Sequence, residues 1–304
     1  MPEGNEIHRW AERHTAAFGD KVVRIEAPST SRFVDAPLLD GRVLKGVRAV
    51  GKHLGYDFGK DRILHVHLGM YGDWTEGTGP LPPEKGALRV RIFDSKKTGD
   101  PKRVKQESAE GSRPHRWYSE DDGSDALDPQ KIAWVELRGP TDCSVYSEAE
   151  WKKLEERLGP DPLNGDGAER FVEIVRSKKT PIAVLLMDQS VAAGVGNILR
   201  AELLHRARMN PFKPGNEIDE KTLKAMWKDL VPLMKSAMVD RRMVTTRPKD
   251  RPTKKTGSPL KEETHYVYRR QGKPCFVCGE DVKTMEMAGR NLFWCPKCQS
   301  ASLQ

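Results

Sequence analysis

Four cysteines near the C-terminal end limit most sharply what this chain can fold into. Cys275 and Cys278 form one C-x2-C pair, and Cys295 and Cys298 form a second pair after sixteen further residues. This spacing is typical of a small β-ribbon whose two knuckles hold one Zn²⁺ through four thiolates, leaving no open ligand position for catalysis. A disulfide framework is disfavoured, because the chain has five cysteines and its charged start lacks an apolar signal-peptide core. The sequence therefore predicts a structural zinc module.

Length and charge narrow the class of the remaining chain. With 304 residues, 37% of them hydrophobic, the chain can form two domains besides the zinc module. No apolar run approaches 18 residues, so we expect no membrane span and no membrane partner. The net charge of +8 favours a polyanionic partner, and together with a zinc ribbon it places DNA or RNA ahead of membranes.

The N-terminal half predicts one helix followed by β structure. Apolar residues recur at helical spacing from Ile7 to Phe18, and Gly19 ends the pattern. Short strand-like runs separated by turn residues then favour a β-sandwich or barrel. These runs are 22–27, 42–50, 53–58, 62–68, 88–94 and 132–137. Residues 95–130 are polar and nearly without aliphatic side chains, which indicates a flexible insertion.

The second half changes to helical patterns. We expect helices over 148–158, 168–176, 182–188, 197–206 and 219–239, with Pro232 as a kink in the last. Gly194-Val195-Gly196-Asn197 precedes the fourth of these helices. The free N–H groups at the start of this helix suit a phosphate, and Asn197 could cap the helix and donate a hydrogen bond from its amide to that phosphate. An ordinary helix–turn–helix joint is the alternative.

The first residues carry a second chemical signal. Removal of Met1 would leave Pro2 as a terminal secondary amine beside Glu3. Such an amine can attack a sugar C1′ and hold the substrate covalently as an iminium, while Glu3 supplies or accepts protons. The alternative is a chain that merely begins with Pro-Glu.

Five ordered motifs together resemble the formamidopyrimidine-DNA glycosylase / endonuclease VIII family. They are Pro2-Glu3-Gly4 with Glu6-Ile7, Gly51-Lys52-His53-Leu54, His67 to Gly72, Met187-Asp188-Gln189 through Gly196-Asn197-Ile198, and the cysteine pairs with Gly289-Arg290 between them. The resemblance covers nearly the whole chain. It implies an α+β fold: an N-terminal helix on a β-sandwich, a helical domain with a helix–two-turn–helix, and a C-terminal zinc-ribbon hairpin. We place these domains at 1–146, 147–264 and 265–304.

The resemblance also implies the catalytic residues. Pro2 would attack C1′ of a damaged nucleotide flipped out of the duplex and leave a Schiff base, and Glu3 would act as general acid on the sugar. Lys52 would contact phosphate and transfer a proton. Arg290, at the hairpin tip, would grip phosphates and assist the second elimination.

Further positions are expected to bind DNA. Met70 matches an apolar side chain that fills the space left by the flipped base, and Glu6 and Asn197 lie in family motifs. Purine-specific members carry an Arg and an aromatic side chain as further wedges on a neighbouring loop, a pair that is not evident here. Arg138, in the comparable region, is the candidate for the opposite-strand contact. Leu292 stands where a small hydroxyl residue is usual.

The sequence thus predicts a monomeric bifunctional DNA glycosylase and AP lyase of base-excision repair, located in a prokaryotic cytoplasm at the nucleoid. The motif around Pro2 and Glu6 is closer to the endonuclease VIII branch, so oxidised pyrimidines are the expected lesions. Three alternatives remain: a non-catalytic zinc-ribbon DNA-binding protein, an 8-oxoguanine or formamidopyrimidine glycosylase, and a lyase acting mainly on abasic sites. Residues 241–261, rich in Lys, Arg and Pro, are expected to form a mobile loop that either lies over DNA phosphates or remains solvated.

Overall fold

The computed structural model describes residues 2–99, 127–165, 167–254 and 257–300, and the chain divides into two compact units. The first unit comprises Met1–Pro2 and Glu6–Glu156, and the second comprises Glu3–Asn5 and Arg157–Gln304. Among the described residues, no helix has both the length and the apolar surface needed to cross a bilayer.

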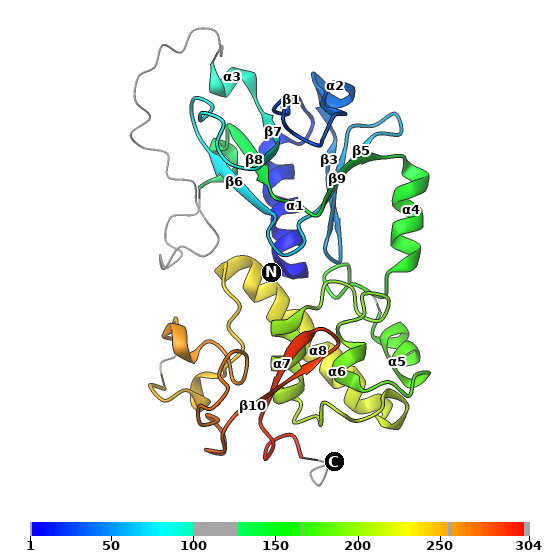
Figure 1. The fold of residues 1–304 in the computed structure, drawn as a ribbon, viewed down its shortest axis with the longest axis vertical. Coiled ribbons are helices and arrows are strands. Elements are labelled where there is room, and N and C mark those ends of the chain that lie inside the picture. Colours follow the sequence, from blue (N-terminus) through cyan, green and yellow to red (C-terminus); the bar gives the residue numbers. More distant parts are fainter. Residues whose placement is uncertain (1, 100–126, 166, 255–256, 301–304) are drawn as a thin grey trace. The chain divides into compact units, whose positions relative to one another are not determined.

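The first unit is built on two antiparallel sheets that share one apolar core (Figure 1). One sheet has the strand order β2-β1-β7-β8-β6 and the other has the order β3-β4-β5-β9. Their bounds are β1 Lys21–Glu26, β2 Arg42–Leu44, β3 Gly46–Val50, β4 His53–Asp57, β5 Ile63–His67, β6 Asp73–Gly77, β7 Leu88–Phe93, β8 Trp134–Arg138 and β9 Asp142–Tyr146. Alternate residues of β4, Leu54 and Tyr56, face the core, as period-2 patterning requires. The expected β-sandwich is confirmed.

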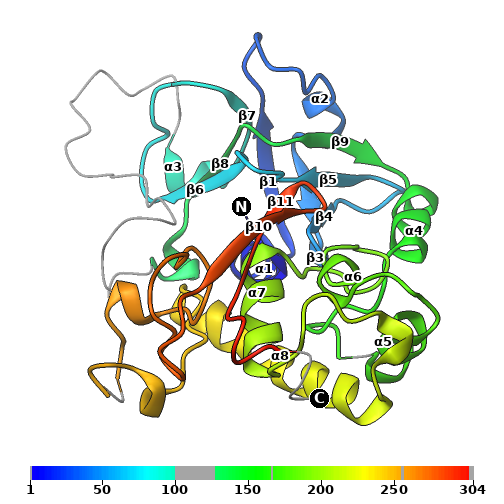
Figure 2. The same ribbon diagram turned by 60° about the horizontal axis from the view of Figure 1, so that its bottom comes forward.

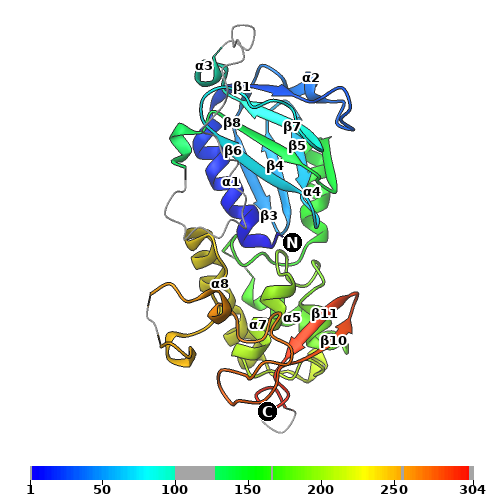
Figure 3. The same cartoon turned by 60° about the vertical axis from the view of Figure 1, so that its left-hand side comes forward.

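Helix α1 (Gly4–Phe18) runs beside the strands of this unit (Figure 3). Ile7, Trp10 and Phe18 on one helical face are buried in the shared core. The helix ends at Gly19, where a Cβ atom would lie only 2.6 Å from the carbonyl oxygen of Thr15. The predicted helix and its glycine stop are therefore both present.

Short helices connect the strands. They are α2 Ala36–Leu39, α3 Ser95–Thr98, the 3-10 turn η1 Pro129–Lys131 and, after the last strand, α4 Glu148–Arg157. Most of the predicted insertion at 95–130 lies outside the described residues. Its described ends form α3, which Asp94 caps by accepting a hydrogen bond from the Lys96 N–H at 2.9 Å, and most of η1.

The second unit contains the helices α5 Ala168–Arg176, α6 Ile182–Leu185, α7 Asn197–Arg206 and α8 Glu220–Asp240, with the 3-10 turn η2 Gly215–Glu217 before α8. Helix α8 runs through Pro232, and the expected kink there stays a prediction. Apolar faces of α5, α7 and α8 meet in one core that includes Phe171 and Trp227, whose ring centroids are 5.1 Å apart.

The segment that connects α8 to the zinc module is anchored by Glu202 of α7. This carboxylate is fully buried and accepts hydrogen bonds from the backbone N–H groups of Tyr266, Val267 and Tyr268 and from the hydroxyl of Thr245. Burial disfavours its charge, but the charge of His265 and the hydrogen bonds together outweigh burial and lower the pKa of Glu202. One ionised side chain thus holds the start of the zinc module on α7.

Replacing Glu202 with Gln is expected to destabilise the protein by about 3 kcal/mol at pH 7, because an amide leaves buried N–H donors unpaired. A depressed carboxyl pKa contributes stability above the unfolded pKa of about 4.3, and this stability is lost as pH falls further. The difference from wild type should therefore shrink below about pH 4. Urea unfolding from pH 7 to pH 3 measures it, and a constant difference would contradict the assignment of charge to Glu202.

The basic segment 241–261 forms two 3-10 turns, η3 Pro248–Asp250 and, at its end, η4 Lys261–Glu263, within its described residues. Arg251 is buried, and its guanidinium donates to the Thr246 hydroxyl at 3.0 Å and to the Gly257 carbonyl at 3.2 Å. Arg251 is thus packed within its own segment, and the expected mobility of 241–261 stays a prediction.

The C-terminal hairpin consists of β10 Lys283–Met287 and β11 Arg290–Trp294, which lie against α7 (Figure 2). Leu292 is fully buried in the helical core, with Met287 and Trp294 packed beside it. The leucine that departs from the usual family residue therefore attaches the hairpin to the helices.

Candidate functional site

Glu3 lies at the N-terminal end of α7 in the second unit. Its side chain is buried, and its two carboxylate oxygens accept hydrogen bonds from the backbone N–H groups of Ile198 at 2.7 Å and Leu199 at 3.2 Å. Helix N-termini present unpaired donors and a positive dipole end, which favour an anion. The carboxylate that follows Pro2 in the chain is therefore held in place by a helix end.

Two glycines make this approach possible. A Cβ atom on Gly196 would lie 2.5 Å from an oxygen of Glu3, and one on Gly4 would lie 2.8 Å from the Cα atom of Gly194. The Gly4 N–H also donates to the Gly194 carbonyl at 2.8 Å. Gln189 orders the turn, since its amide accepts from the Gly194 N–H. The glycine turn before α7, which the sequence predicted to meet a phosphate, thus admits Glu3.

Asn197 does not cap α7, contrary to the prediction. Gly196 occupies the cap position, and the donors that were expected to receive a phosphate bind Glu3 instead. The Asn197 amide donates to the Asn291 carbonyl of β11 at 3.1 Å, and its oxygen accepts from Arg200 at 2.5 Å. A primary amide has two hydrogens, so Asn197 can donate a second hydrogen bond besides the one to Asn291. DNA binding by Asn197 stays a prediction.

Arg290 begins β11 directly after the hairpin turn. Ala288 and Gly289 both have positive φ, at 53° and 68°, and Met287 pairs with Arg290 across the turn. Two such residues give a tight turn whose twist matches the strands, and the alanine is strained there. Arg290 is exposed, which suits a guanidinium that meets phosphate.

The four cysteines, one pair before β10 and one pair after β11, lie close together in space. Their sulfur atoms all lie within 4.8 Å of one another, with 3.9 Å between Cys275 and Cys298 and 3.4 Å between Cys278 and Cys295. Zn–S bonds of about 2.3 Å in a tetrahedron place two sulfurs roughly 3.8 Å apart, so the donor set fits one zinc ion. Burial raises the pKa of the Cys295 thiol to about 11, and a bound Zn²⁺ would displace that proton. The zinc has a structural role.

In the first unit, Lys52 lies in the turn between β3 and β4, beside three histidines. His53 pairs with His67 across the strands, and its Nδ1 lies 2.9 Å from Nε2 of His65, whose Nδ1 contacts Asp142 at 3.1 Å. Burial, followed by the charge of Lys52, lowers the pKa of His67, and burial lowers that of His65 to about 4. Both histidines are therefore neutral at pH 7, beside the cationic Lys52.

Met70 lies in the turn between β5 and β6, and its role as a wedge stays a prediction. Its side chain is 49% exposed, and that of the next residue, Tyr71, is 83% exposed. Gly69 permits the turn, since its φ is +67° and a Cβ atom there would meet the Thr141 side chain at 1.8 Å. Tyr71 is a further candidate that the sequence analysis did not name, although an aromatic side chain next to Met70 was a visible signal.

Arg138 lies at the end of β8 and is engaged within its own sheet. Its guanidinium pairs with Glu136 and donates to the Thr75 hydroxyl at 3.0 Å and to the Lys85 carbonyl at 3.2 Å. Reaching DNA would break these bonds. Glu6 is buried on α1. The DNA-binding roles of Arg138 and Glu6 stay predictions.

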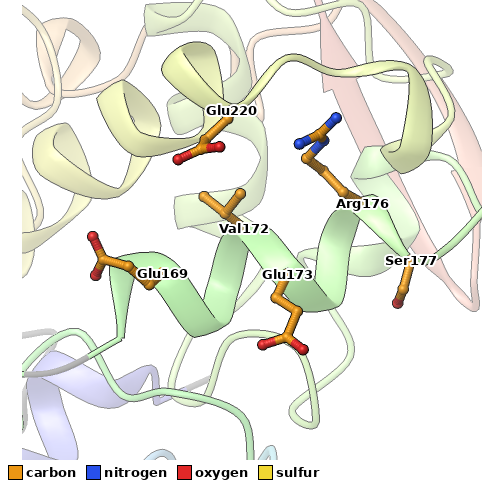
Figure 4. Close-up of a pocket in the computed structure, with 6 residues that line it drawn as sticks. All are labelled: Glu169, Val172, Glu173, Arg176, Ser177 and Glu220. Atoms are coloured by element: carbon orange, nitrogen blue, oxygen red, sulfur yellow. The ribbon is translucent and has the colours of Figure 1, made fainter.

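A shallow hollow of about 410 Å³ lies elsewhere in the second unit, between α5 and the start of α8 (Figure 4). Glu169, Glu173 and Glu220 line it together with Arg176, and Lys224 forms ion pairs with two of these carboxylates. Its predominantly acidic wall is unsuited to a nucleic-acid backbone.

Family models match three parts of the chain. The formamidopyrimidine-DNA glycosylase N-terminal domain matches residues 1–104, the H2TH domain of the same family matches 158–248, and the zinc finger found in FPG and IleRS matches 272–301. Endonuclease 8 1 of Mycobacterium tuberculosis is 38% identical over 99% of this chain and 100% of its own. The formamidopyrimidine-DNA glycosylase of a Roseiflexus species is 26% identical, covering 98% of this chain and 100% of its own.

Solved structures agree on the fold. The MutM (FPG) protein of Thermus thermophilus superimposes with a TM-score of 0.66 at 24% identity, covering 98% of both chains. A Lactococcus lactis FPG mutant, solved with Fapy-dG containing DNA, gives 0.69 at 21% identity, covering 98% of this chain and 100% of that one. With its zinc-binding cysteines and H2TH helices, the chain belongs to the formamidopyrimidine-DNA glycosylase / endonuclease VIII family, whose members are DNA glycosylases with AP-lyase activity in base-excision repair.

Proposed function

We propose that this protein excises oxidised pyrimidines from DNA through a Schiff base on Pro2 and then nicks the strand by β- and δ-elimination. The observation that carries the proposal is the carboxylate of Glu3, which two N–H groups of α7 hold directly after Pro2 in the chain. A DNA-binding module without catalysis has no use for a fixed carboxylate beside a terminal amine.

Glu3 as held is a proton acceptor, which orders the proposed steps. Attack of the Pro2 nitrogen on C1′ expels the base and leaves a positively charged amine, whose proton Glu3 accepts. Glu3 returns this proton to the ring oxygen as the C1′–O4′ bond breaks, and the nitrogen lone pair forms the iminium. The iminium then acidifies the C2′ proton, and its loss expels the 3′ phosphate.

Phosphate contacts are assigned to cationic and amide side chains. Lys52 is supported by its position in a turn beside two histidines that are neutral at pH 7, and Arg290 by its exposure at the hairpin. The Asn197 amide would add a third contact. We assign Glu6 to the edge of the lesion site and Arg138 to the opposite strand, as the family resemblance suggests.

The pyrimidine preference rests on the wedge turn and on the relatives. Met70 and Tyr71 are both exposed on one turn, so one apolar and one aromatic side chain are available to fill the space of a flipped base. Non-planar oxidised pyrimidines already stack poorly and leave the duplex at a lower cost. The 38% identity to an endonuclease 8 supports the same branch.

In single-turnover assays, thymine glycol or dihydrouracil is therefore expected to be cut faster than 8-oxoguanine paired with cytosine. Changing Tyr71 to Ala should slow base excision about 10-fold, because a base–aromatic stack is worth roughly 1–3 kcal/mol. Changing Met70 to Ala should also slow it, because the apolar wedge that fills the space of the flipped base is lost. Lyase action on a preformed abasic site should change little, since no base is extruded there.

The abasic-site substrate is the control for both variants. If 8-oxoguanine opposite cytosine is the best substrate, the pyrimidine assignment is wrong, although the Pro2 mechanism would stand. If wild-type protein cuts only abasic sites, the protein is a lyase without glycosylase function.

DNA that contains oxidised bases or abasic sites is the partner. We further propose that the protein acts as a monomer in the bacterial cytoplasm, at the nucleoid. The proposed location is supported by the bacterial origin of the relatives. We also propose the division into a catalytic sandwich at 1–146, a helix–two-turn–helix domain at 147–264 and a zinc ribbon at 265–304, with an insertion at 95–130.

A further inference from the structure

Arg200 of α7 is a buried cation beneath the C-terminal hairpin. Its side chain has no exposed surface, yet it lies one helical turn from the end of α7 that holds Glu3. One terminal nitrogen donates to the Asn197 side-chain oxygen at 2.5 Å and to the Asn291 carbonyl at 3.1 Å, and the other to the Met287 carbonyl at 3.4 Å. The guanidinium therefore bridges α7 to both strands of the hairpin.

This contact is costly for stability. The Nε atom of Arg200 has no hydrogen-bond partner among the described residues. Burial, and then the like charge of Arg290, lower the pKa of Arg200 to about 10, while the charge of Glu3 opposes them. Arg200 is thus still protonated at pH 7. Among the described residues, the guanidinium donates hydrogen bonds to two backbone carbonyls and one side-chain amide and to no carboxylate. A buried cation held in this way contributes little to stability, which points to a role in positioning.

The bonds fix two groups that the proposed function places on DNA. The Asn197 amide donates one hydrogen to the Asn291 carbonyl, and its oxygen accepts a hydrogen bond from Arg200. These two bonds fix the orientation of the amide plane and therefore the direction of its second hydrogen. Met287 and Asn291 flank Arg290 on the two strands of the hairpin. The same guanidinium therefore orients the Asn197 amide and fixes the base of the turn that carries Arg290.

We propose that Arg200 is a positioning residue for strand cutting, which sets the Asn197 amide and the Arg290 hairpin on α7 without touching DNA. The inference rests on the proposed function, since it assumes that Asn197 and Arg290 contact phosphates. The planar guanidinium is required because it donates to several acceptors in a fixed geometry. Lysine keeps the charge but presents a single flexible nitrogen, and glutamine keeps a planar donor group without the charge.

The test compares Arg200→Lys and Arg200→Gln with Arg206→Lys. Arg206 is a second partly buried arginine of α7, which pairs with Asp229 and donates to the Thr245 carbonyl, away from the hairpin. For each protein, zinc content and melting temperature report the fold. Affinity for a duplex with an uncleavable abasic analogue is measured over a salt series, and β- and δ-elimination products are measured on a preformed abasic site.

Both Arg200 variants are expected to retain zinc and to cut the strand about 10-fold more slowly, with a lower ratio of δ- to β-elimination product. The slope of log affinity against log salt should fall by about 0.9 for each phosphate that the variant no longer neutralises. Arg206→Lys should lower the melting temperature but leave the product ratio and the salt slope unchanged.

Three results would overturn the inference. Unchanged ratio and slope in both Arg200 variants would show that the guanidinium positions nothing. Loss of zinc or of cooperative melting in both would assign Arg200 to the fold of the hairpin. Equal effects in Arg206→Lys would assign the loss to general destabilisation. Failure of wild-type protein to cut any abasic or lesion duplex would refute the proposed function instead, since the salt slopes are measured without catalysis.

Discussion

Protein that retains any residue before Pro2 is expected to cut lesion-containing DNA at least about 1,000-fold more slowly than protein that begins at Pro2, as for loss of a catalytic nucleophile. Within a chain, the proline nitrogen is a tertiary amide, with no hydrogen and with its lone pair delocalised into the carbonyl. It then cannot attack C1′. The comparison uses one chain with a removable N-terminal tag, assayed in single turnover before and after a protease exposes Pro2.

Binding supplies the control for this loss. The tagged protein should retain zinc and bind an abasic-analogue duplex within a few-fold of the processed protein, because Lys52, Asn197 and Arg290 are unchanged. Pro2→Gly decides little, since glycine at the terminus also provides an amine. Equal cleavage rates before and after tag removal would show that another group is the nucleophile.

Loss of the zinc site is expected to have the second largest effect. Cys295 is fully buried, and its replacement by Ser removes one of four thiolates from a site whose metal contributes on the order of 10 kcal/mol in isolated zinc modules. The hairpin between Cys278 and Cys295 should then lose its fold. Zinc content, DNA affinity and strand cutting are all expected to fall together.

Arg290→Ala separates the metal from the hairpin tip. Arg290 is exposed and its guanidinium donates to the Gly289 carbonyl at 3.0 Å, so the variant should keep one zinc per chain while strand cutting weakens. Metal analysis of freshly purified protein checks both variants. Native protein without zinc, or a zinc-free Cys295→Ser that cuts normally, would contradict the structural role.

The sequence predicted the elements whose signals are local. The zinc site depends on the spacing within 275–298, and α1 and α8 depend on apolar residues at helical intervals. Strand β6 was missed because its buried side chains include Glu76. That carboxylate is buried by a bidentate pair with Arg13, which lies in α1 and far away in sequence. A strand whose polar side chains are buried by pairing with distant residues has the sequence pattern of a loop.

The candidate site shows the same limit. Asn197 is a good helix cap by residue type, but Glu3, which lies 195 residues from Ile198, occupies the donors of that helix. Arg200 falls on a helix whose other buried residues are mostly apolar, and its role depends on carbonyl groups of the hairpin. Residue type indicates which groups can act, whereas contacts between distant segments decide which groups they meet.

The most direct test of the account is the identity of the residue that becomes bound to DNA. Protein that begins at Pro2 is incubated with a lesion duplex and borohydride, which reduces an iminium to a stable amine, and the adduct is digested and mapped by mass spectrometry. The sugar remnant is expected on the N-terminal peptide, at the nitrogen of Pro2. A remnant on Lys52 or any other lysine, with an unmodified N-terminal peptide, would contradict the Pro2 mechanism.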